Sequence, residues 1–148
     1  MQRRAFRFLT YYLPLLIWLG FIFFASSGQF SANNTSRIVG PLVLWLFPNT
    51  SPETLGVIHG ITRKLAHFTE YALLAFLAAR AFRTSANAFL RNNWFMVSFA
   101  LVAVYALLDE YHQSFVPSRT ASVVDSLIDM FGGLTMLLFL RRRHQANR

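Results

Sequence analysis

The 148-residue chain is 55% hydrophobic and only 14% charged, well below the roughly 25% charged residues of a typical soluble domain. A chain this short exposes much of its surface, so a large apolar core cannot explain the shortfall, whereas lipid as the surrounding solvent can. The net charge of +8 comes mainly from arginines beside apolar runs, which is typical of anchors at a lipid headgroup layer and argues against a nucleic-acid partner. The absence of cysteine excludes disulfides and thiolate chemistry.

Four apolar runs approach the length of about 20 residues that a helix needs to cross a bilayer. They cover about 8–25, 65–82, 94–108 and 123–140. We therefore expect an all-α fold, a polytopic bundle of four transmembrane helices that forms a single membrane domain over 1–148. The first run also has features of a secretory signal, but its length favours a retained membrane anchor.

The segment between the first two predicted spans is expected to add an interfacial or re-entrant element. Residues 38–47 are apolar but too few to cross the bilayer. Ser51 followed by Pro52 is typical of a helix start, with Ser51 as the N-cap. The second helix is therefore expected to begin outside the bilayer, and Gly56 and Gly60 leave open a break along it.

Basic residues are divided unequally between the two sides of a four-span arrangement. Ten of them precede the first span, separate the second from the third, or follow the fourth. The other side has four, which are Arg37, Arg63, Lys64 and Arg119. Because cytoplasmic loops are enriched in Lys and Arg, both termini are predicted to be cytoplasmic.

Acidic residues are few, and their placement predicts a site. Five of the six lie in or beside the outer portions of the predicted spans, namely Glu70, Asp109, Glu110, Asp125 and Asp129. Charge at membrane depth is expensive unless it faces the bundle interior or a wet region. We therefore predict one polar site near the non-cytoplasmic ends of the helices.

Helical spacing indicates which side chains join this site. Steps of three and four residues place Lys64, His67 and Glu70 in one sector of the second helix, and Asp125 and Asp129 on one face of the fourth. The candidate binding residues are, in chain order, Lys64, His67, Glu70, Tyr71, Asp109, Glu110, His112, Gln113, Arg119, Asp125 and Asp129.

Two adjacent glycines, Gly132 and Gly133, remove side-chain bulk from the fourth helix and predict close packing against another helix. Asp125 is expected to lie deep beside this contact and to act structurally. His67 and Glu110 are expected to lie nearer the water boundary.

Three motifs lie within a core of residues 63–133. They read Lys64-x-x-His67-Phe68-x-x-Tyr71, then Glu110-x-x-Gln113-x-Phe115-x-Pro117-x-Arg119, and finally Asp125 with Asp129 four residues later and Gly132 after it. Together they resemble the VanZ-like family of bacterial membrane proteins, whose founding member is associated with teicoplanin resistance. Asp129 stands where that family usually has Asn, so no role is transferred to this position.

The resemblance implies a multi-pass protein of the bacterial plasma membrane, part of the cell envelope. The polar outer site is expected to engage a lipid headgroup, a lipid-linked cell-wall precursor or a glycopeptide-type antibiotic, with a role in antibiotic resistance as one consequence. Arg119 is the expected anion contact, with Lys64 assisting as a point charge. The expected partners are the bilayer and such an amphiphile, without nucleic acid and without a cofactor.

Two other functions stay open. Paired carboxylates beside histidine can supply acid–base catalysis to an enzyme that acts on a lipid or lipid-linked substrate. A divalent metal held by Glu70, Glu110, His112 and Asp125 would serve the same kind of enzyme. Proton or ion movement is the least favoured function, because the inner halves of the second and fourth spans are almost entirely apolar.

Overall fold

The computed structural model describes residues 6, 8–26, 32–116 and 122–146, and it is all-helical over them. The elements are η1 (Phe8–Tyr12, a π-helix), α2 (Leu13–Ser26), α3 (Ala32–Leu46), α4 (Pro52–Arg83), α5 (Ala88–Asn92), α6 (Trp94–Gln113) and α7 (Val123–Ala146). The predicted anion contact Arg119 lies outside the described residues.

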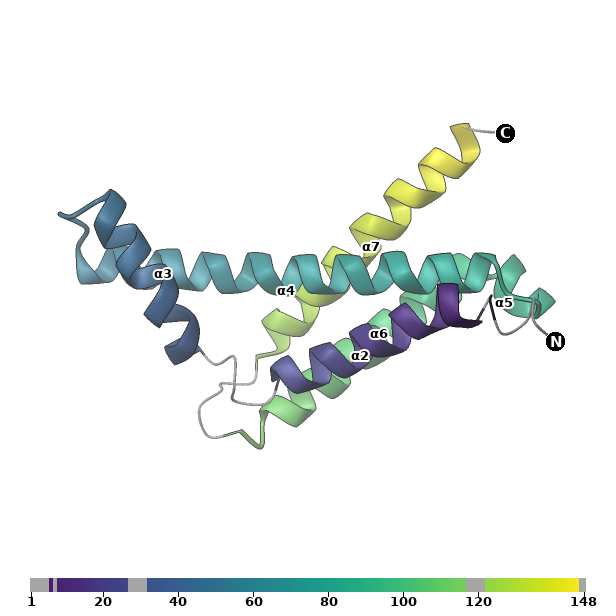
Figure 1. The fold of residues 1–148 in the computed structure, drawn as a ribbon, viewed down its shortest axis with the longest axis horizontal. Coiled ribbons are helices and arrows are strands. Elements are labelled where there is room, and N and C mark those ends of the chain that lie inside the picture. The colour runs from purple at the N-terminus through teal and green to yellow at the C-terminus, as the bar shows by residue number, and fades with distance from the viewer. Residues whose placement is uncertain (1–5, 7, 27–31, 117–121, 147–148) are drawn as a thin grey trace.

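Helix α4 is the axis around which the other helices pack (Figure 1). Its 32 residues extend about 48 Å at 1.5 Å per residue, which exceeds the thickness of a bilayer core. The predicted start is confirmed, because Ser51 caps the helix by accepting a hydrogen bond from the Thr54 N–H at 3.2 Å and Pro52 opens it. The helix continues without a break through Gly56 and Gly60.

Small residues bring α4, α6 and α7 into close contact. Ala75, Ala78 and Ala79 of α4 are fully buried. On α7, a Cβ at Gly132 would collide with the Phe68 carbonyl oxygen, and a Cβ at Gly133 would lie 2.6 Å from a Val102 methyl group. The close packing predicted from the two glycines is therefore present, and it fixes which face of α7 points at its neighbours.

Three helical segments are long and apolar enough to cross a membrane, by length and composition. They are Phe8–Ser26, Trp94–Gln113 and Val123–Ala146, which match three of the four predicted spans. Helix α4, expected to cross at 65–82, is not among them, because His67, Glu70 and Arg80 interrupt its apolar stretch. Helix α4, which carries these polar residues, is the helix that the other helices pack against.

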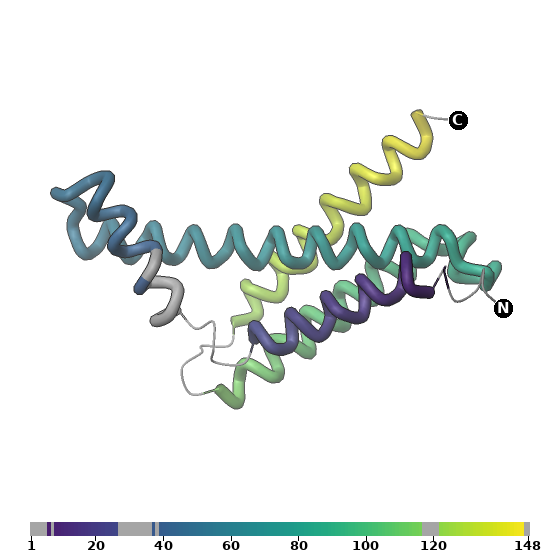
Figure 2. Tube along the Cα trace, in the orientation of Figure 1, coloured from purple at the N-terminus to yellow at the C-terminus, as the bar shows by residue number. Residues whose placement is uncertain are grey.

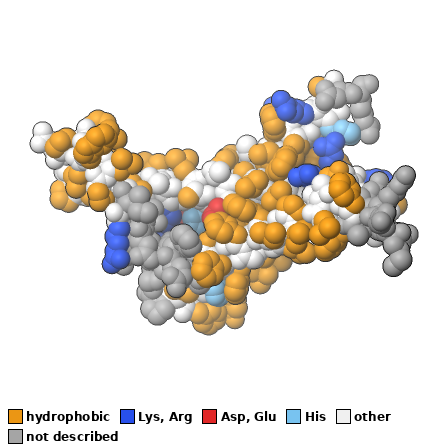
Figure 3. All heavy atoms as spheres, in the orientation of Figure 1, with side chains coloured by type: hydrophobic (Ala, Val, Ile, Leu, Met, Phe, Trp, Pro, Cys, Tyr) orange, Lys and Arg blue, Asp and Glu red, His pale blue; other side chains and the backbone are white. Residues whose placement is uncertain are grey.

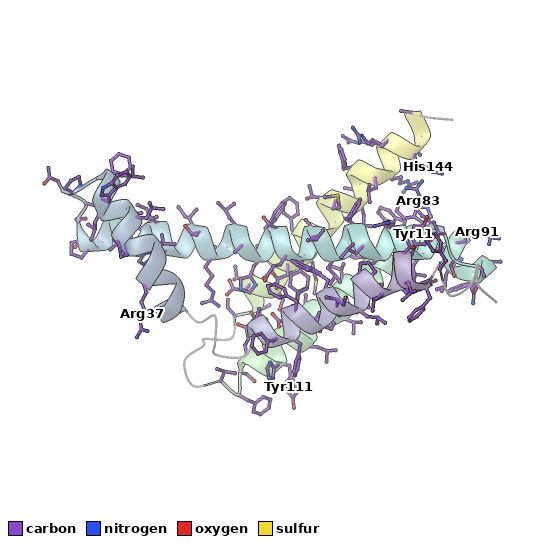
Figure 4. The ribbon with its side chains drawn as sticks, in the orientation of Figure 1. Tyr11, Arg37, Arg83, Arg91, Tyr111 and His144 are labelled. Atoms are coloured by element: carbon purple, nitrogen blue, oxygen red, sulfur yellow. The ribbon has the colours of Figure 1, made fainter. Side chains whose placement is uncertain are left out.

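The described N-terminal and C-terminal ends of the chain lie on the same side of the molecule, where α7 projects away from the other helices (Figure 2). The Arg80 guanidinium lies 5.0 Å from the centre of the Tyr11 ring, and Arg83 Nη2 lies 3.0 Å from His144 Nδ1. Figure 4 shows Tyr11, Arg83, Arg91 and His144 gathered there. We call this the basic end; its described arginines are Arg80, Arg83, Arg91, Arg141, Arg142 and Arg143.

Helix α3 lies outside the bundle and packs only against α4 among the described helices (Figure 1). Its Gly40 faces His59, which lies on the part of α4 before the bundle begins. Trp45 is 77% exposed. The segment 38–47, for which we expected an interfacial or re-entrant element, is thus largely a helix with exposed apolar side chains.

Candidate functional site

A cluster of polar side chains is buried where α4, α6 and α7 meet, away from the basic end. Helix α4 contributes His67, α6 contributes Asp109, Glu110 and Gln113, and α7 contributes Asp129. All five side chains are buried, and Gln113 and Asp129 have no exposed surface. We call these five residues the polar cluster. The face seen in Figure 3 is rich in hydrophobic side chains and shows a small acidic patch near its middle.

The length of α6 explains why its polar residues point into the bundle. We expected the third span to end at about residue 108, but the helix continues to Gln113. Asp109 and Gln113 are therefore one turn apart on the buried face. The Gln113 Nε2 donates a hydrogen bond to Asp109 Oδ2 at 2.8 Å, which orients that carboxylate.

Asp129 and His67 face each other across the contact between α7 and α4. Asp129 Oδ1 lies 3.3 Å from His67 Nδ1, but the two atoms are not aligned as a hydrogen bond. Within the described part of the chain, neither Asp129 oxygen receives a hydrogen bond from protein. A buried carboxylate without donors is costly, so this residue needs a partner other than the side chains that the structure describes.

Asp109 completes a compact group with His67 and Asp129. One nitrogen or oxygen atom from each of the three lies within 4.8 Å of the others. Two ionised carboxylates no more than 4.8 Å apart repel by at least roughly 3.5 kcal/mol at an effective dielectric constant of 20. A cation, a proton or hydrogen-bond donors must offset that repulsion.

Glu110 joins the start of α7 to the end of α6. Its Oε2 accepts a hydrogen bond from the backbone N–H of Ser122 at 2.6 Å. Its Oε1 has no hydrogen-bond partner among the described residues. Glu110 therefore sets where α7 begins and leaves one oxygen directed into a buried region.

Arg63 and Asp125 form the border of the cluster. The Arg63 Nη2 donates to Asp125 Oδ2 at 3.1 Å, with side chains that are 28% and 14% exposed. Asp125 is therefore more exposed than the buried His67 and Glu110, so our expectation that Asp125 lies deeper while these two lie nearer to water was wrong. The residue missed from the sequence is Arg63. Its signal was the four-residue spacing to His67 and on to Tyr71, which places all three on one face.

Other predicted residues lie apart from the cluster. Lys64 is exposed on α4, and Glu70 is half-buried. His112 stacks on Phe23 of α2 with ring centres 4.7 Å apart. The helices therefore do not assemble the metal ligands that we considered from the sequence, Glu70, Glu110, His112 and Asp125; in the described chain they assemble His67, Asp109 and Asp129.

Tyr71 borders the cluster but acts as a structural contact. It is fully buried, and its hydroxyl donates to the Tyr105 carbonyl at 3.4 Å. The Tyr105 hydroxyl in turn donates to the Leu19 carbonyl at 2.5 Å. These hydrogen bonds connect α4, α6 and α2 just inside the polar end of the bundle.

Comparison with known proteins identifies one family. The sequence matches the family model VanZ-LLP1, described as VanZ/LLP1, over residues 9–143, nearly the whole chain. No curated protein and no solved structure matches it.

Proposed function

Because the chain belongs to the VanZ/LLP1 family, we propose that it is a multi-pass protein of the bacterial plasma membrane that binds a phosphate-bearing headgroup. The headgroup belongs to a membrane lipid or to a lipid-linked cell-wall precursor. The observation that carries the proposal is the pair of basic side chains beside the buried polar cluster, because the Arg63 side chain is 28% exposed and Lys64 is exposed. Ionisable residues at membrane depth are usually functional, and basic side chains among them can bind an anion.

The proposed topology has four crossings with both termini in the cytoplasm. Helix α4 would be the fourth crossing helix, with its polar residues shielded by α2, α6 and α7. The support is the clustering of arginines at the end where α4 and α7 finish and α6 begins. The positive-inside rule assigns that end to the cytoplasm and the polar cluster to the outer half of the membrane.

Cysteine labelling tests this topology directly, because the chain has no native cysteine. Asn49→Cys and Ser114→Cys, both exposed near the polar end, should react with an impermeant maleimide added to intact cells. Ala88→Cys and Asn92→Cys of α5, also exposed, should stay unlabelled until the cells are opened. Labelling of Ala88→Cys in intact cells would contradict the topology.

Charge and apolar surface at the polar end fit an anionic amphiphile. The Arg63 side chain is 28% exposed, and Lys64 beside it is exposed. Arg37 extends from α3 near this end (Figure 4). Exposed Leu108 of α6 and Leu127 of α7 flank the cluster. A headgroup phosphate would meet the basic side chains, while its chains lie along these leucines.

We place α3 at the membrane surface beside the site. It packs on the part of α4 that extends beyond the bundle and carries exposed Leu42, Trp45 and Leu46 near its C-terminal end. Exposed apolar and aromatic side chains on a short helix are typical of interfacial helices. In this position α3 would border the route by which a lipid reaches Arg63.

Native mass spectrometry of gently extracted protein tests headgroup binding. We expect a retained phospholipid or polyprenyl diphosphate, and about tenfold weaker retention in Arg63→Gln, because a charge-assisted contact is lost. Arg142→Gln, at the basic end, is the matched control and should retain the lipid. Added phosphatidylglycerol, polyprenyl diphosphate and teicoplanin distinguish the three amphiphiles. Equal retention of neutral diacylglycerol would contradict the proposal.

The proximity of the His67 and Asp129 side chains favours a second candidate function, that of an enzyme acting on the same lipid class. His67 Nδ1 lies 3.3 Å from Asp129 Oδ1, and a histidine beside a carboxylate is a common general base. Incubation with a lipid diphosphate, followed by measurement of released phosphate, separates the two functions. Catalysis requires turnover that His67→Gln abolishes, whereas a binding protein retains the lipid unchanged.

A further inference from the structure

We infer that His67, Asp109 and Asp129 form a binding site for a divalent first-row metal ion, with Zn²⁺ and Mn²⁺ as the class it fits. Helices α4, α6 and α7 contribute one ligand each, and the donor atoms lie within 4.8 Å of one another. Independently of this grouping, the Asp129 side chain is fully buried, and neither of its oxygens has a hydrogen-bond donor in the described chain.

The distance between Asp129 Oδ1 and His67 Nδ1 suits two ligands of one ion. Tetrahedral coordination at 2.0–2.1 Å separates neighbouring ligand atoms by about 3.3 Å, and octahedral coordination at 2.1 Å by about 3.0 Å. The two atoms lie 3.3 Å apart without hydrogen-bond alignment. Ligands of one ion need no hydrogen bond between them, so this geometry is expected of a metal site.

Charge also favours a divalent ion. Two ionised carboxylates and a neutral imidazole carry a formal charge of −2, which a divalent cation neutralises. The nearby guanidinium of Arg63 contacts Asp125 at 3.1 Å and therefore serves a different carboxylate. Imidazole combined with carboxylates favours Zn²⁺ and its first-row neighbours over Ca²⁺ and Mg²⁺, which prefer oxygen ligands alone.

Gln113 supplies the outer support that metal ligands usually have. Its Nε2 donates to Asp109 Oδ2 at 2.8 Å, and the side chain is fully buried. A hydrogen bond to one carboxylate oxygen orients the other one for coordination. Gln113 is thus a positioning residue, and its loss should weaken metal binding by about 10- to 100-fold.

The inference goes beyond headgroup binding, because a metal ion can be held without a lipid. Three protein ligands leave at least one coordination position for water. If the proposed headgroup site is also correct, a phosphate oxygen can take that position, and this last step rests on the proposed function. The ion would then join the buried acids to an anionic ligand that they would otherwise repel.

Metal titration of detergent-purified protein, stripped with EDTA and free of added lipid, tests the site. We expect one equivalent of Zn²⁺ or Mn²⁺ to bind and raise the Tm, with Mg²⁺ and Ca²⁺ much weaker. Asp129→Asn and His67→Gln should each weaken binding by more than about 100-fold, because each removes a direct ligand. Glu53→Gln, exposed at the start of α4, is the acidic control and should bind normally.

Two results would overturn the inference. One is a wild-type Tm that does not respond to EDTA or to added metal, as expected if the His67–Asp129 contact were merely structural. The other is metal binding that persists in the Asp129→Asn/His67→Gln double variant, which would assign the binding to residues outside the cluster, such as His144.

Spectroscopy of the wild type keeps the inference testable if these variants do not fold. Co²⁺ added to the stripped protein should give a visible absorption band that one equivalent of Zn²⁺ removes; no band would overturn the inference. Measuring lipid retention in the same protein distinguishes the metal site from the proposed headgroup binding. Metal binding without any retained lipid supports the metal site and contradicts headgroup binding. Retained lipid without metal binding supports headgroup binding and contradicts the metal site.

Discussion

The two ends of the helix bundle carry their charge in opposite ways. At the basic end, Arg83 stacks over Trp94 at 5.2 Å and Arg143 over Phe139 at 5.1 Å. Arg143 is exposed and Arg83 is half-buried. At the polar end, Asp129 and Glu110 are buried and keep oxygens without hydrogen-bond donors in the described chain.

The difference concerns solvation. An arginine near the surface keeps much of its hydration while its stem covers apolar surface, so its position costs little. A buried carboxylate loses hydration and recovers it only through donors or a cation. Surface arginines, which cost little free energy to place, therefore indicate topology. Buried carboxylates, which cost much more, point to a bound partner. The predictions below test this contrast from the largest expected effect to the smallest.

Gly132→Ala should have the largest effect, because the polar end exists only while α7 packs directly on α4. The added Cβ would collide with the Phe68 carbonyl oxygen, so one helix must shift. We expect a loss of about 1–3 kcal/mol in the free energy of unfolding. Gly20→Ala on α2 is the matched control, since nothing lies within 4 Å of its added Cβ.

Thermal unfolding in detergent measures both glycine variants. In the control, replacing glycine inside a helix should leave the Tm unchanged or slightly higher. Equal stability of the two variants would mean that α4 and α7 are not held at this distance. The geometry of the polar cluster would then lose its structural basis.

Tyr105→Phe should have an intermediate effect. It removes the hydroxyl that donates to the Leu19 carbonyl and connects α6 to α2. A partly buried hydrogen bond of this kind contributes about 1 kcal/mol. Tyr111→Phe is the control, because Tyr111 is exposed and points away from the bundle (Figure 4). A Tm drop of the same size in both variants would argue against this tie between the helices.

Arg63→Gln should have the smallest effect on stability of these variants. Comparing it with Arg142→Gln tests directly whether arginines at the two ends differ in their contribution to stability. Its contact with Asp125 is partly exposed, so we expect a loss of about 0.5–1 kcal/mol that shrinks at high salt. Arg142→Gln at the basic end should change stability by less than about 0.5 kcal/mol. If both substitutions cost the same at every salt concentration, the two ends would not differ as we describe.

Helical spacing predicted which helix faces carry polar residues, but it did not predict how deep each residue lies or which way its side chain points. Hydropathy and helical spacing placed His67, Asp109 and Asp129 among the candidate residues, but they did not single out these three as neighbours. Assigning greater depth to Asp125 was wrong, because Asp125 lies nearer the helix end and pairs with Arg63. The hypothesis that His112 joins acidic residues as a metal ligand was also wrong, because the His112 ring stacks on Phe23.

The count of spans shows a different limit. Phe8–Ser26, Trp94–Gln113 and Val123–Ala146 have apolar side chains on most of their faces, so composition alone identifies them. Helix α4 carries its polar residues at a face covered by other helices. An average hydropathy cannot distinguish a membrane-spanning helix whose polar face is covered by other helices from a helix that lies outside the membrane.

Local composition and helical spacing determined the helical class, the membrane environment, the start of α4 at Ser51 and the separation of basic from acidic residues. Each of these depends on neighbours along the chain or on contact with solvent. Only the tertiary structure decided that His67 meets Asp109 and Asp129. Their meeting depends on how α6 and α7 are rotated about their axes, which the contacts of Gly132 and Gly133 with α4 and α6 set.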